Sequence, residues 1–313
     1  MTQSRFQQLK AKVALLTVAV FFGWASTASA TLNVVTTTED IASLARQIGG
    51  GHVEVMSLTR GYQDAHFMQA KPSLMVRMHS ADLLIYQGLE LEVGWLPLLI
   101  QGARNPKIFL GQPGHLDMSI AIDPIQVPEG PLDRSMGDVH PFGNPHYTLD
   151  PSNIKPMAYL LADHLSKLDP GHATEYKANR DRFVKTFEAH HARWKEIMKP
   201  YRGKKLVTYH RTWDYFLQHF GLVSIGTVET KPGVQPTPAH LAELAETMKA
   251  QKVKLILQAN YYRLRFSELL ADKTGATLLS LPPAVGGVPE TKDTIEFFEY
   301  LVKRITEALK MDE

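Results

Sequence analysis

Three histidines in the chain lie where a metal ion could be bound. His66 follows a strand-like run and its loop, His146 lies in a segment between two prolines, and His210 ends a second strand-like run. Neutral imidazole is the nitrogen ligand that zinc favours, and three or four protein ligands make a zinc site. We therefore predict that these three side chains converge on a single metal ion.

The chain contains thirteen histidines, so their positions must separate ligands from bystanders. Adjacent residues of a helix point in different directions, and His190 and His191 therefore cannot chelate one ion as a pair. Nine histidines fall on expected helix faces or at helix ends and are interpreted as ordinary surface or core residues: His52, His79, His115, His164, His172, His190, His191, His219 and His240.

The composition is that of a soluble globular protein. Hydrophobic residues make up 44% of the 313 residues and charged residues 21%, which suits roughly two domains. Residues 1–30 have the layout of a secretory signal peptide, with basic residues, an apolar run from Val13 to Trp24, and the small-residue sequence Ala28-Ser29-Ala30. Its removal would move the formal charge from +2 to −1, which gives no sign of a nucleic-acid partner.

The sequence contains no cysteine, which excludes disulfides, thiolate metal sites, a cysteine nucleophile and a lipid-modified cysteine. No stretch after residue 30 is apolar for long enough to be a transmembrane helix. These features predict an exported, soluble, periplasmic protein that acts as a monomer.

Strand-like and helical segments alternate through both halves of the chain. Strands are expected at 32–38, 53–58, 81–86, 204–208, 222–227, 253–258 and 277–281. Helices are expected at 39–48, 72–79, 90–100, 151–168, 212–220, 238–250, 263–274 and 291–310. Such alternation predicts parallel, doubly wound sheets, whose ligand crevices lie at the carboxyl ends of the strands.

One helix without proline or glycine is expected over about 172–198, and residues 111–142 are rich in Gly, Pro and Asp and are expected to be a loop. We predict an α/β fold of two doubly wound lobes bridged by one long rigid helix, with the metal site in the interlobe cleft. The predicted division is a signal peptide at 1–30, an N-terminal lobe at 31–171, a bridging helix at 172–200 and a C-terminal lobe at 201–313.

Several segments resemble the zinc/manganese class of periplasmic metal-binding proteins of ABC importers (TroA-like, cluster A-I). The resemblance covers essentially the whole mature chain, and no single motif carries it. Its segments are Asp64-Ala65-His66-Phe67, Lys71-Pro72-Ser73, 81–85, Gly88-Leu89-Glu90-Leu91-Glu92, Asn144-Pro145-His146-Tyr147-Thr148-Leu149-Asp150-Pro151, Tyr209-His210, Asp214-Tyr215-Phe216 and Phe220-Gly221-Leu222.

The resemblance implies two lobes bridged by a rigid helix, with His66, His146 and His210 as the three histidine ligands. It also implies capture of a divalent transition metal, delivery to the membrane permease of an ABC importer, and the option of a metallochaperone that loads the site. Asp64 and Asp150 are candidates for carboxylates that orient the rings.

The chain departs from the resemblance at the fourth ligand position. Members of this class carry a carboxylate in the last quarter of the chain, where this sequence reads Ser280-Leu281-Pro282-Pro283. Glu290 is the first candidate replacement because it is nearest in sequence, and His140, Asp138 or a water molecule are the alternatives. Loss of the carboxylate favours Zn²⁺ over Mn²⁺, since manganese prefers oxygen donors.

Two other functions fit parts of the sequence. A zinc hydrolase could use an open coordination position, but the chain has neither an HExxH motif nor a Gly-x-Ser-x-Gly turn. A binder of an organic solute or of a metal chelate could line its cleft with Tyr261, Tyr262, Arg263 and Arg265. The leading hypothesis is a metal-binding protein that is not an enzyme.

Overall fold

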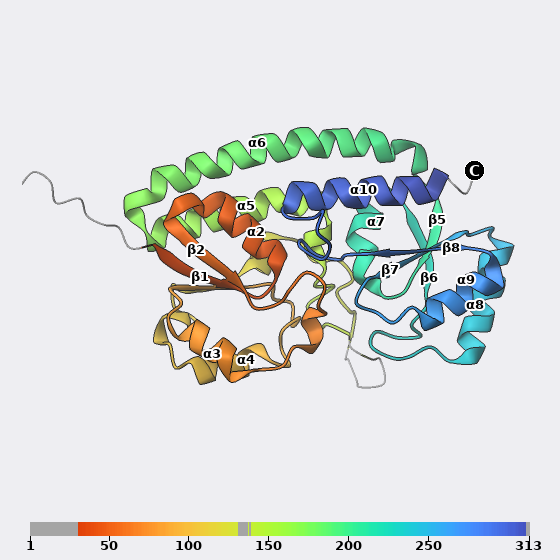
Figure 1. Cartoon of the computed structure of the whole chain (residues 1–313), viewed down its shortest axis with the longest axis horizontal. Helices are drawn as coiled ribbons and strands as arrows, with labels where there is room; N and C mark the ends of the chain where they lie inside the picture. The colour runs from red at the N-terminus through yellow and green to blue at the C-terminus, as the bar shows by residue number, and fades with distance from the viewer. Residues whose placement is uncertain (1–30, 131–136, 138, 311–313) are drawn as a thin grey trace, which may run out of the picture. The chain divides into compact units, whose positions relative to one another are not determined.

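The computed structural model describes residues 31–130, 137 and 139–310. The signal peptide predicted at residues 1–30 lies outside the described residues. The described chain contains two four-stranded sheets in which every strand pairing is parallel. Helices lie on both faces of each sheet (Figure 1), so the predicted fold class of two doubly wound α/β lobes is confirmed.

The first lobe has the strand order β2-β1-β3-β4. Its strands are β1 (Leu32–Thr36), β2 (Val53–Ser57), β3 (Leu83–Tyr86) and β4 (His115–Asp117). Its helices are α2 (Glu39–Gly49), α3 (Pro72–His79), α4 (Leu96–Ala103) and α5 (Pro151–Leu168).

The second lobe repeats this arrangement with the order β6-β5-β7-β8. Its strands are β5 (Lys205–Thr208), β6 (Val223–Thr227), β7 (Leu255–Ala259) and β8 (Thr277–Leu281). Its helices are α7 (Asp214–Phe220), α8 (Pro238–Ala250), α9 (Arg265–Thr274) and α10 (Thr294–Lys310).

Alternate residues of each central strand face different helices, as the pleat of a strand requires. In β1, Val34 packs into a core with α2, α5 and α6, whereas Val35 packs with α3 and α4. In β5, Leu206 and Val207 divide in the same way between α10 and α8. Both faces of each sheet are therefore buried, which explains why these strands are nearly continuous apolar runs.

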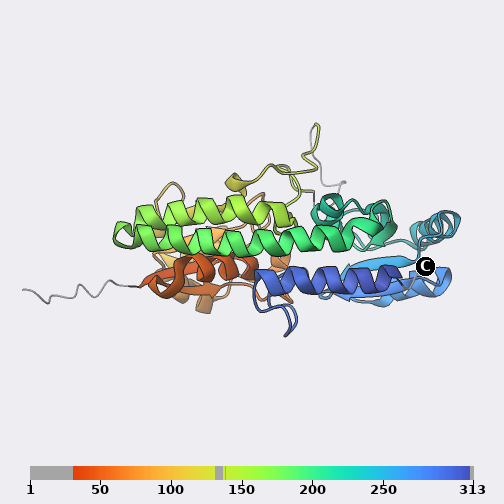
Figure 2. The same cartoon turned by 90° about the horizontal axis from the view of Figure 1, so that it is seen from above.

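The bridging helix α6 (Ala173–Met198) runs along both lobes. Its 26 residues make it about 39 Å long at the standard rise per residue. It packs against α5 and α2 of the first lobe and α10 of the second, and seen from above these helices lie side by side (Figure 2).

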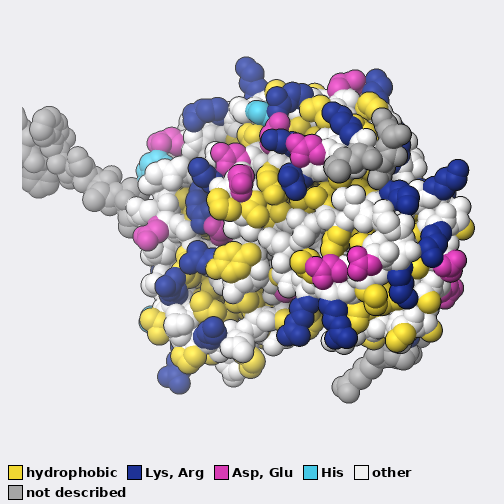
Figure 3. Space-filling view, turned by 45° about the vertical axis from the view of Figure 1, so that its right-hand side comes forward, with side chains coloured by type: hydrophobic (Ala, Val, Ile, Leu, Met, Phe, Trp, Pro, Cys, Tyr) yellow, Lys and Arg dark blue, Asp and Glu magenta, His cyan; other side chains and the backbone are white. Residues whose placement is uncertain are grey.

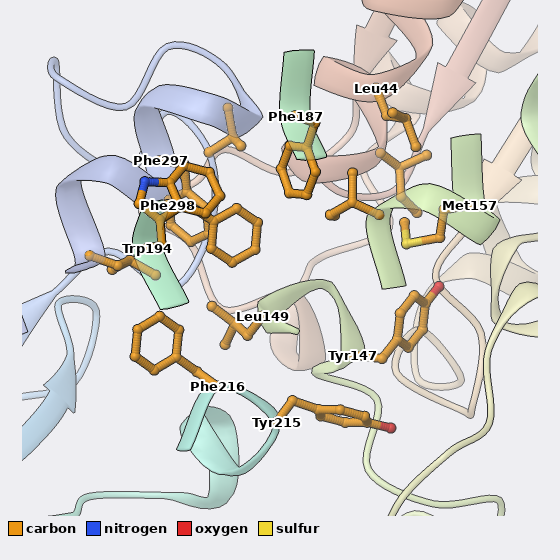
Figure 4. Close-up of a cluster of buried hydrophobic side chains, with 14 of the residues drawn as sticks. Leu44, Tyr147, Leu149, Met157, Phe187, Trp194, Tyr215, Phe216, Phe297 and Phe298 are labelled. Carbon is orange, nitrogen blue, oxygen red and sulfur yellow. The ribbon is translucent and has the colours of Figure 1, made fainter. Parts of the chain in front are cut away.

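The helix covers one apolar core that continues from the first lobe into the second. On α6, Phe183 and Phe187 contribute to this core from the middle of the helix, and Trp194 contributes from its end. Side chains from both lobes meet around it (Figure 4), and the figure labels Leu44, Tyr147, Leu149, Met157, Phe187, Trp194, Tyr215, Phe216, Phe297 and Phe298.

Direct contacts also join the lobes near the start of α2. The carboxylate of Asp40 accepts a hydrogen bond from the backbone N–H of Val285 at 3.0 Å, and the hydroxyls of Ser43 and Thr294 lie 3.0 Å apart. Gly61 approaches the same segment so closely that a Cβ atom there would lie 2.0 Å from the carbonyl oxygen of Val285. Only glycine fits at this position without moving the backbone.

Two expectations about secondary structure are wrong. The helix predicted over 90–100 begins at Leu96, because Leu89 and Glu90 have positive φ and the carboxylate of Glu92 is buried against backbone N–H groups of Gln87 and Gly88. The region 111–142, predicted to be a loop, contains the short strand β4. Three residues are too few for a periodic pattern to be visible in the sequence.

No helix among the described residues is both long and apolar enough to span a membrane. On the face seen in Figure 3, basic and acidic side chains are interspersed with hydrophobic ones, and neither sign of charge forms a continuous field.

Candidate metal centre

Each of the three predicted histidines follows a strand or begins a short helical turn. His66 lies in the 3₁₀ helix Ala65–Phe67 after β2, and His210 directly precedes the 3₁₀ helix Arg211–Trp213 after β5. His146 precedes a third such turn, Tyr147–Leu149, which leads into α5. Each histidine therefore lies in or directly before a short 3₁₀ turn.

The structure brings the three imidazoles together between the lobes. One potential ligand nitrogen of each of His66, His146 and His210 lies within 4.8 Å of those of the other two. The ring centroids are 5.1 Å apart for His66 and His146, 5.5 Å for His146 and His210, and 6.0 Å for His66 and His210. Tetrahedral coordination by nitrogens at about 2.0–2.1 Å would draw these atoms to about 3.3 Å from one another.

Two of these nitrogens are buried without a hydrogen-bond partner among the described residues, so they could bind a cation. Among the described residues, Nε2 of His66 and Nε2 of His146 have no hydrogen-bond partner. Burial, together with the neighbouring histidines His66, His210 and His140, holds the pKa of His146 well below its ordinary value. The His146 ring is therefore neutral and its lone pair is available, which is the form that a metal ion binds.

The carboxylate of Asp64 holds the His66 ring. Nδ1 of His66 donates to Oδ1 of Asp64 at 2.7 Å, and the backbone N–H of His66 donates to the same oxygen at 3.0 Å. Burial raises the pKa of Asp64, but its hydrogen bonds and electrostatic interaction with His66 outweigh that effect and keep this pKa below its ordinary value. The arrangement places the ring proton on Nδ1 and directs the Nε2 lone pair into the cleft.

A second carboxylate, Glu229, holds the His210 ring in the same way and was missed in the sequence. Nδ1 of His210 lies 2.8 Å from Oε2 of Glu229, and their side chains are 9% and 7% exposed. The pairing of Thr208 with Thr227 in adjacent parallel strands explains the contact, since each partner lies two residues beyond its strand. The sequence signal for Glu229 is an acidic residue two positions after the end of β6. That signal points to His210 only if β5 and β6 are known to be neighbours in the sheet.

Asn144 fixes the segment that carries His146. Its side-chain oxygen accepts the backbone N–H of His146 at 2.9 Å, and its amide donates to the carbonyl of Arg211 at 3.0 Å. The hydroxyl of Tyr215 donates to the carbonyl of Asn144 at 2.9 Å. Because Arg211 and Tyr215 belong to the second lobe, these bonds set His146 at a fixed position relative to His210.

His140 lies beside the three histidines. Its ring centroid is 5.2 Å from that of His66, and it lines a small cavity together with His146 and His210. It is outside the set of three whose ligand atoms are all within 4.8 Å of one another. Asp138, the other candidate from this loop, lies outside the described residues.

The structure does not bring Glu290 to the three histidines. Glu290 is exposed in the turn between β8 and α10 and is not in the three-histidine group. The turn is closed by Thr291, whose backbone N–H and hydroxyl both donate to the carbonyl of Val288, at 3.2 and 3.0 Å. Thr291 is buried as a result, and the preceding Glu290 is directed to the surface. Pro283 and Ala284 instead line the cavity beside His66.

Asp150 contacts a histidine outside the cluster. Its carboxylate caps α5 by accepting the backbone N–H of Ser152 at 2.8 Å, and it lies 2.7 Å from Nδ1 of His219. An aspartate directly before a helix that begins with proline satisfies the free N–H groups of the first turn. That local role accounts for Asp150 without any contact to the metal centre.

The aromatic residues considered for an organic ligand have a structural role. The ring of Tyr262 stacks on that of Tyr209 at a centroid distance of 4.4 Å, and Tyr261 lies against Tyr262 at 4.6 Å. Arg263 and Arg265 are exposed. Only Tyr261 of this group lines the small cavity that also contains His66 and His146.

Replacement of Asp64 by asparagine should weaken metal binding by about 10-fold to 100-fold, which is the usual cost of removing a carboxylate that orients a metal-binding histidine. The amide can still accept a hydrogen bond but no longer favours a proton on Nδ1 of His66 through its charge. Competition with a chelator measures the affinity. Asp214→Asn is the matched control, because Asp214 pairs with Arg211 rather than with a histidine. Equal affinities for the two variants would contradict the role of Asp64.

Two α/β lobes that share a bridging helix and hold clustered imidazoles between them define a two-lobed protein of the metal-binding type. The chain belongs to the family described as "Zinc-uptake complex component A periplasmic" (ZnuA), whose model matches residues 34–308. This is a family of substrate-binding proteins for metal uptake, not of enzymes, so the hydrolase hypothesis is set aside.

Individual relatives bind different metals. The chain is 26% identical over 289 residues to the high-affinity zinc uptake system protein ZnuA of Yersinia pestis, covering 88% of this chain and 91% of that protein. It is 24% identical over 275 residues to the iron-binding protein YfeA of the same organism, covering 84% of each chain. The family therefore identifies a metal-binding protein of ABC uptake without identifying the metal.

Solved structures share the fold. A crystal structure of ZnuA has a TM-score of 0.74 at 23% identity and covers 89% of this chain and 99% of its own. A Mn-bound periplasmic metal-binding protein from Candidatus Liberibacter asiaticus has a TM-score of 0.73 at 19% identity, covering 89% of this chain and 100% of its own.

Proposed function

We propose that this chain captures Zn²⁺ in the periplasm through His66, His146 and His210 and delivers it to the permease of an ABC importer. The convergence of one ligand nitrogen from each histidine within 4.8 Å carries the proposal. The exported location rests on the signal-peptide layout of residues 1–30 and on the family's periplasmic members. The mature protein acts as a soluble monomer, with a metallochaperone as an optional donor of the ion.

His140 is the proposed fourth ligand. Its ring is next to that of His66, and its charge contributes to the lowered pKa of His146, so the two rings are electrostatically close. A small movement of the loop that carries His140 would complete a tetrahedral set, and a water molecule would take the position otherwise. His140→Ala should then weaken binding less than loss of one of the three clustered histidines.

A site made of imidazoles favours Zn²⁺ over Mn²⁺. The nearby carboxylates of Asp64 and Glu229 are engaged with ring nitrogens, so they act through the histidines rather than as oxygen ligands. Competition between the two ions for the mature chain, followed by metal analysis of protein purified without chelator, tests this choice. Retention of Mn²⁺ in the presence of equal Zn²⁺ would contradict it.

The space around the cluster suits an ion and not an organic solute. The two cavities that contain His146 each have a volume of about 40 Å³. One water molecule occupies about 30 Å³ in the liquid, whereas sites for organic ligands measure several hundred. The larger groove that reaches His210 contains neither His66 nor His146.

Release of the ion requires movement of loops rather than separation of the lobes. The continuous core beneath α6 and the bond between Asp40 and Val285 join the lobes. Bending at α6 would expose this core at a cost of about 25 cal/mol for each Å² uncovered. The turn Ala65–Phe67, which carries His66, contributes no residue to this core and can move without that cost.

Binding of Zn²⁺ at about pH 6 should release at most two protons from the three clustered histidines, because the His146 ring is already neutral in the free protein. The direction of this effect follows from the lowered pKa of His146. Because its ring is already neutral, it releases no proton when the ion binds, and protonation of His146 does not weaken metal binding as the pH falls toward 6. Calorimetric titration in buffers of different ionisation enthalpy counts the protons. In the His140→Ala variant, which removes the proposed fourth ligand from the count, a release of three would show that His146 is charged in the free protein.

A further inference from the structure

A second group of metal-ligating side chains lies on the first lobe, away from the interlobe cleft. His52 ends the short turn before β2, and His172 and Glu175 lie at the start of α6. One potential ligand atom of each lies within 4.8 Å of those of the other two. Among the described residues, this group and the interlobe histidines are the two that satisfy this criterion.

The three side chains already contact one another. Nε2 of His52 lies 2.6 Å from Oε2 of Glu175, and the rings of His52 and His172 are stacked with their centroids 3.7 Å apart. The side chains are 28% exposed for His52, 16% for His172 and 60% for Glu175, so an ion could reach them from solvent. Two imidazoles and one carboxylate form a ligand set that zinc and related ions use, with positions left open.

A further carboxylate orients His172. Nδ1 of His172 donates to Oδ2 of Asp169 at 2.6 Å, and the same oxygen accepts the hydroxyl of buried Tyr176 at 2.8 Å. Nε2 is thereby left as the ligand atom of this ring. Asp64 and Glu229 hold histidines of the interlobe cluster by the same kind of contact.

The stacking shows what binding would require. Two stacked rings inclined by only 20° hold their lone pairs in separate, nearly parallel planes, whereas the lone pairs of two ligands must converge on one ion. His52 is the more exposed ring and lies at the end of a three-residue turn, so it is the ring that would rotate. This adjustment costs free energy and makes the site weaker than a fully preorganised one.

We propose that His52, His172 and Glu175 form a second, weaker site for a divalent transition-metal ion of the Zn²⁺ type. The ion fastens the chain before β2 to the first turn of α6, two segments that are more than a hundred residues apart in the sequence. The site is independent of the interlobe cluster, because none of its residues lines the cavities beside His66, His146 and His210.

Titration of the mature chain with Zn²⁺ against competing chelators of graded affinity tests the proposal. The intact protein should bind one equivalent tightly and a second more weakly. His172→Ala and His52→Ala should each abolish the weaker event and leave the tight one unchanged, and His66→Ala should do the reverse. In the intact protein, absence of the tight event alone would point to failure of the proposed zinc function. Absence of the weak event alone would point to failure of the second site.

Two further variants test whether the loss of the second binding event comes from the loss of a ligand rather than from general damage to the structure. Asp169→Asn leaves all three ligands in place and should weaken only the second equivalent, by about 10-fold to 100-fold. His79→Ala, which removes an exposed histidine outside both groups, should change neither event. Co²⁺ in place of Zn²⁺ gives a visible spectrum for each site. Binding of a single equivalent by the intact protein, or an unchanged second event in both His52→Ala and His172→Ala, would overturn the proposal.

Discussion

His146→Ala is expected to lower the affinity for Zn²⁺ by more than about 100-fold, which exceeds the upper cost of altering a residue that only orients a ligand. His146 supplies a buried and neutral imidazole with an Nε2 that has no hydrogen-bond partner among the described residues. Its removal leaves two of the three clustered imidazoles, one from each lobe. Chelator competition with the mature protein measures the loss.

The control for this variant is His164→Ala, which removes another histidine of the first lobe, whose Nε2 interacts with the carbonyl of Pro113 rather than with the cluster. Both variants should retain the circular dichroism spectrum of the folded protein. If His146→Ala binds Zn²⁺ within a few-fold of the intact chain while remaining folded, His146 is not a ligand and the proposed centre is wrong.

Trp194→Ala is expected to lower the free energy of unfolding by about 3–5 kcal/mol, the usual range for removing a buried tryptophan or phenylalanine. Trp194 is fully buried on α6, and its ring lies 5.5 Å from those of both Phe187 and Phe298. Its indole N–H also donates to Glu299 at 2.8 Å. The substitution therefore opens a cavity between α6 and α10 and removes a hydrogen bond.

Urea unfolding followed by circular dichroism measures this change. Ile197→Ala is the matched control, because Ile197 lies on the same helix with 39% of its surface exposed and should cost far less. A loss below about 1 kcal/mol for Trp194→Ala would mean that the surrounding side chains collapse into the space, contrary to the packing described.

Most of the fold follows from patterns that are local in the sequence. α3, α5, α8 and β8 begin and end where the periodicity and the flanking Pro, Gly and Asp residues predict. The start of α4 could not be placed in this way, because buried Glu92 binds the backbone of the preceding turn and holds it out of the helix. That contact depends on tertiary burial, which periodicity does not encode.

The sequence predicted the part of the candidate site that consists of histidines next to strand ends or prolines, and not the rest. His66, His146 and His210 stood out by type and position, and the structure brings them together. Glu229 did not stand out, because its relation to His210 depends on which strands are neighbours in the sheet. Glu290 was chosen because it is near the missing carboxylate in sequence, but the turn closed by Thr291 directs it to the surface. Asp150 caps a helix instead.

The core shared by both lobes also has a thermodynamic consequence. A chain whose lobes had only separate cores could lose one lobe while the other stayed folded, but here one apolar face of each sheet contributes to a continuous cluster. An ion that binds only the folded protein adds its binding free energy to that of the entire cooperative unit. Metal binding in the interlobe cleft should therefore slow the hydrogen exchange of backbone amides in β1 of the first lobe as much as that of amides in β5 of the second lobe.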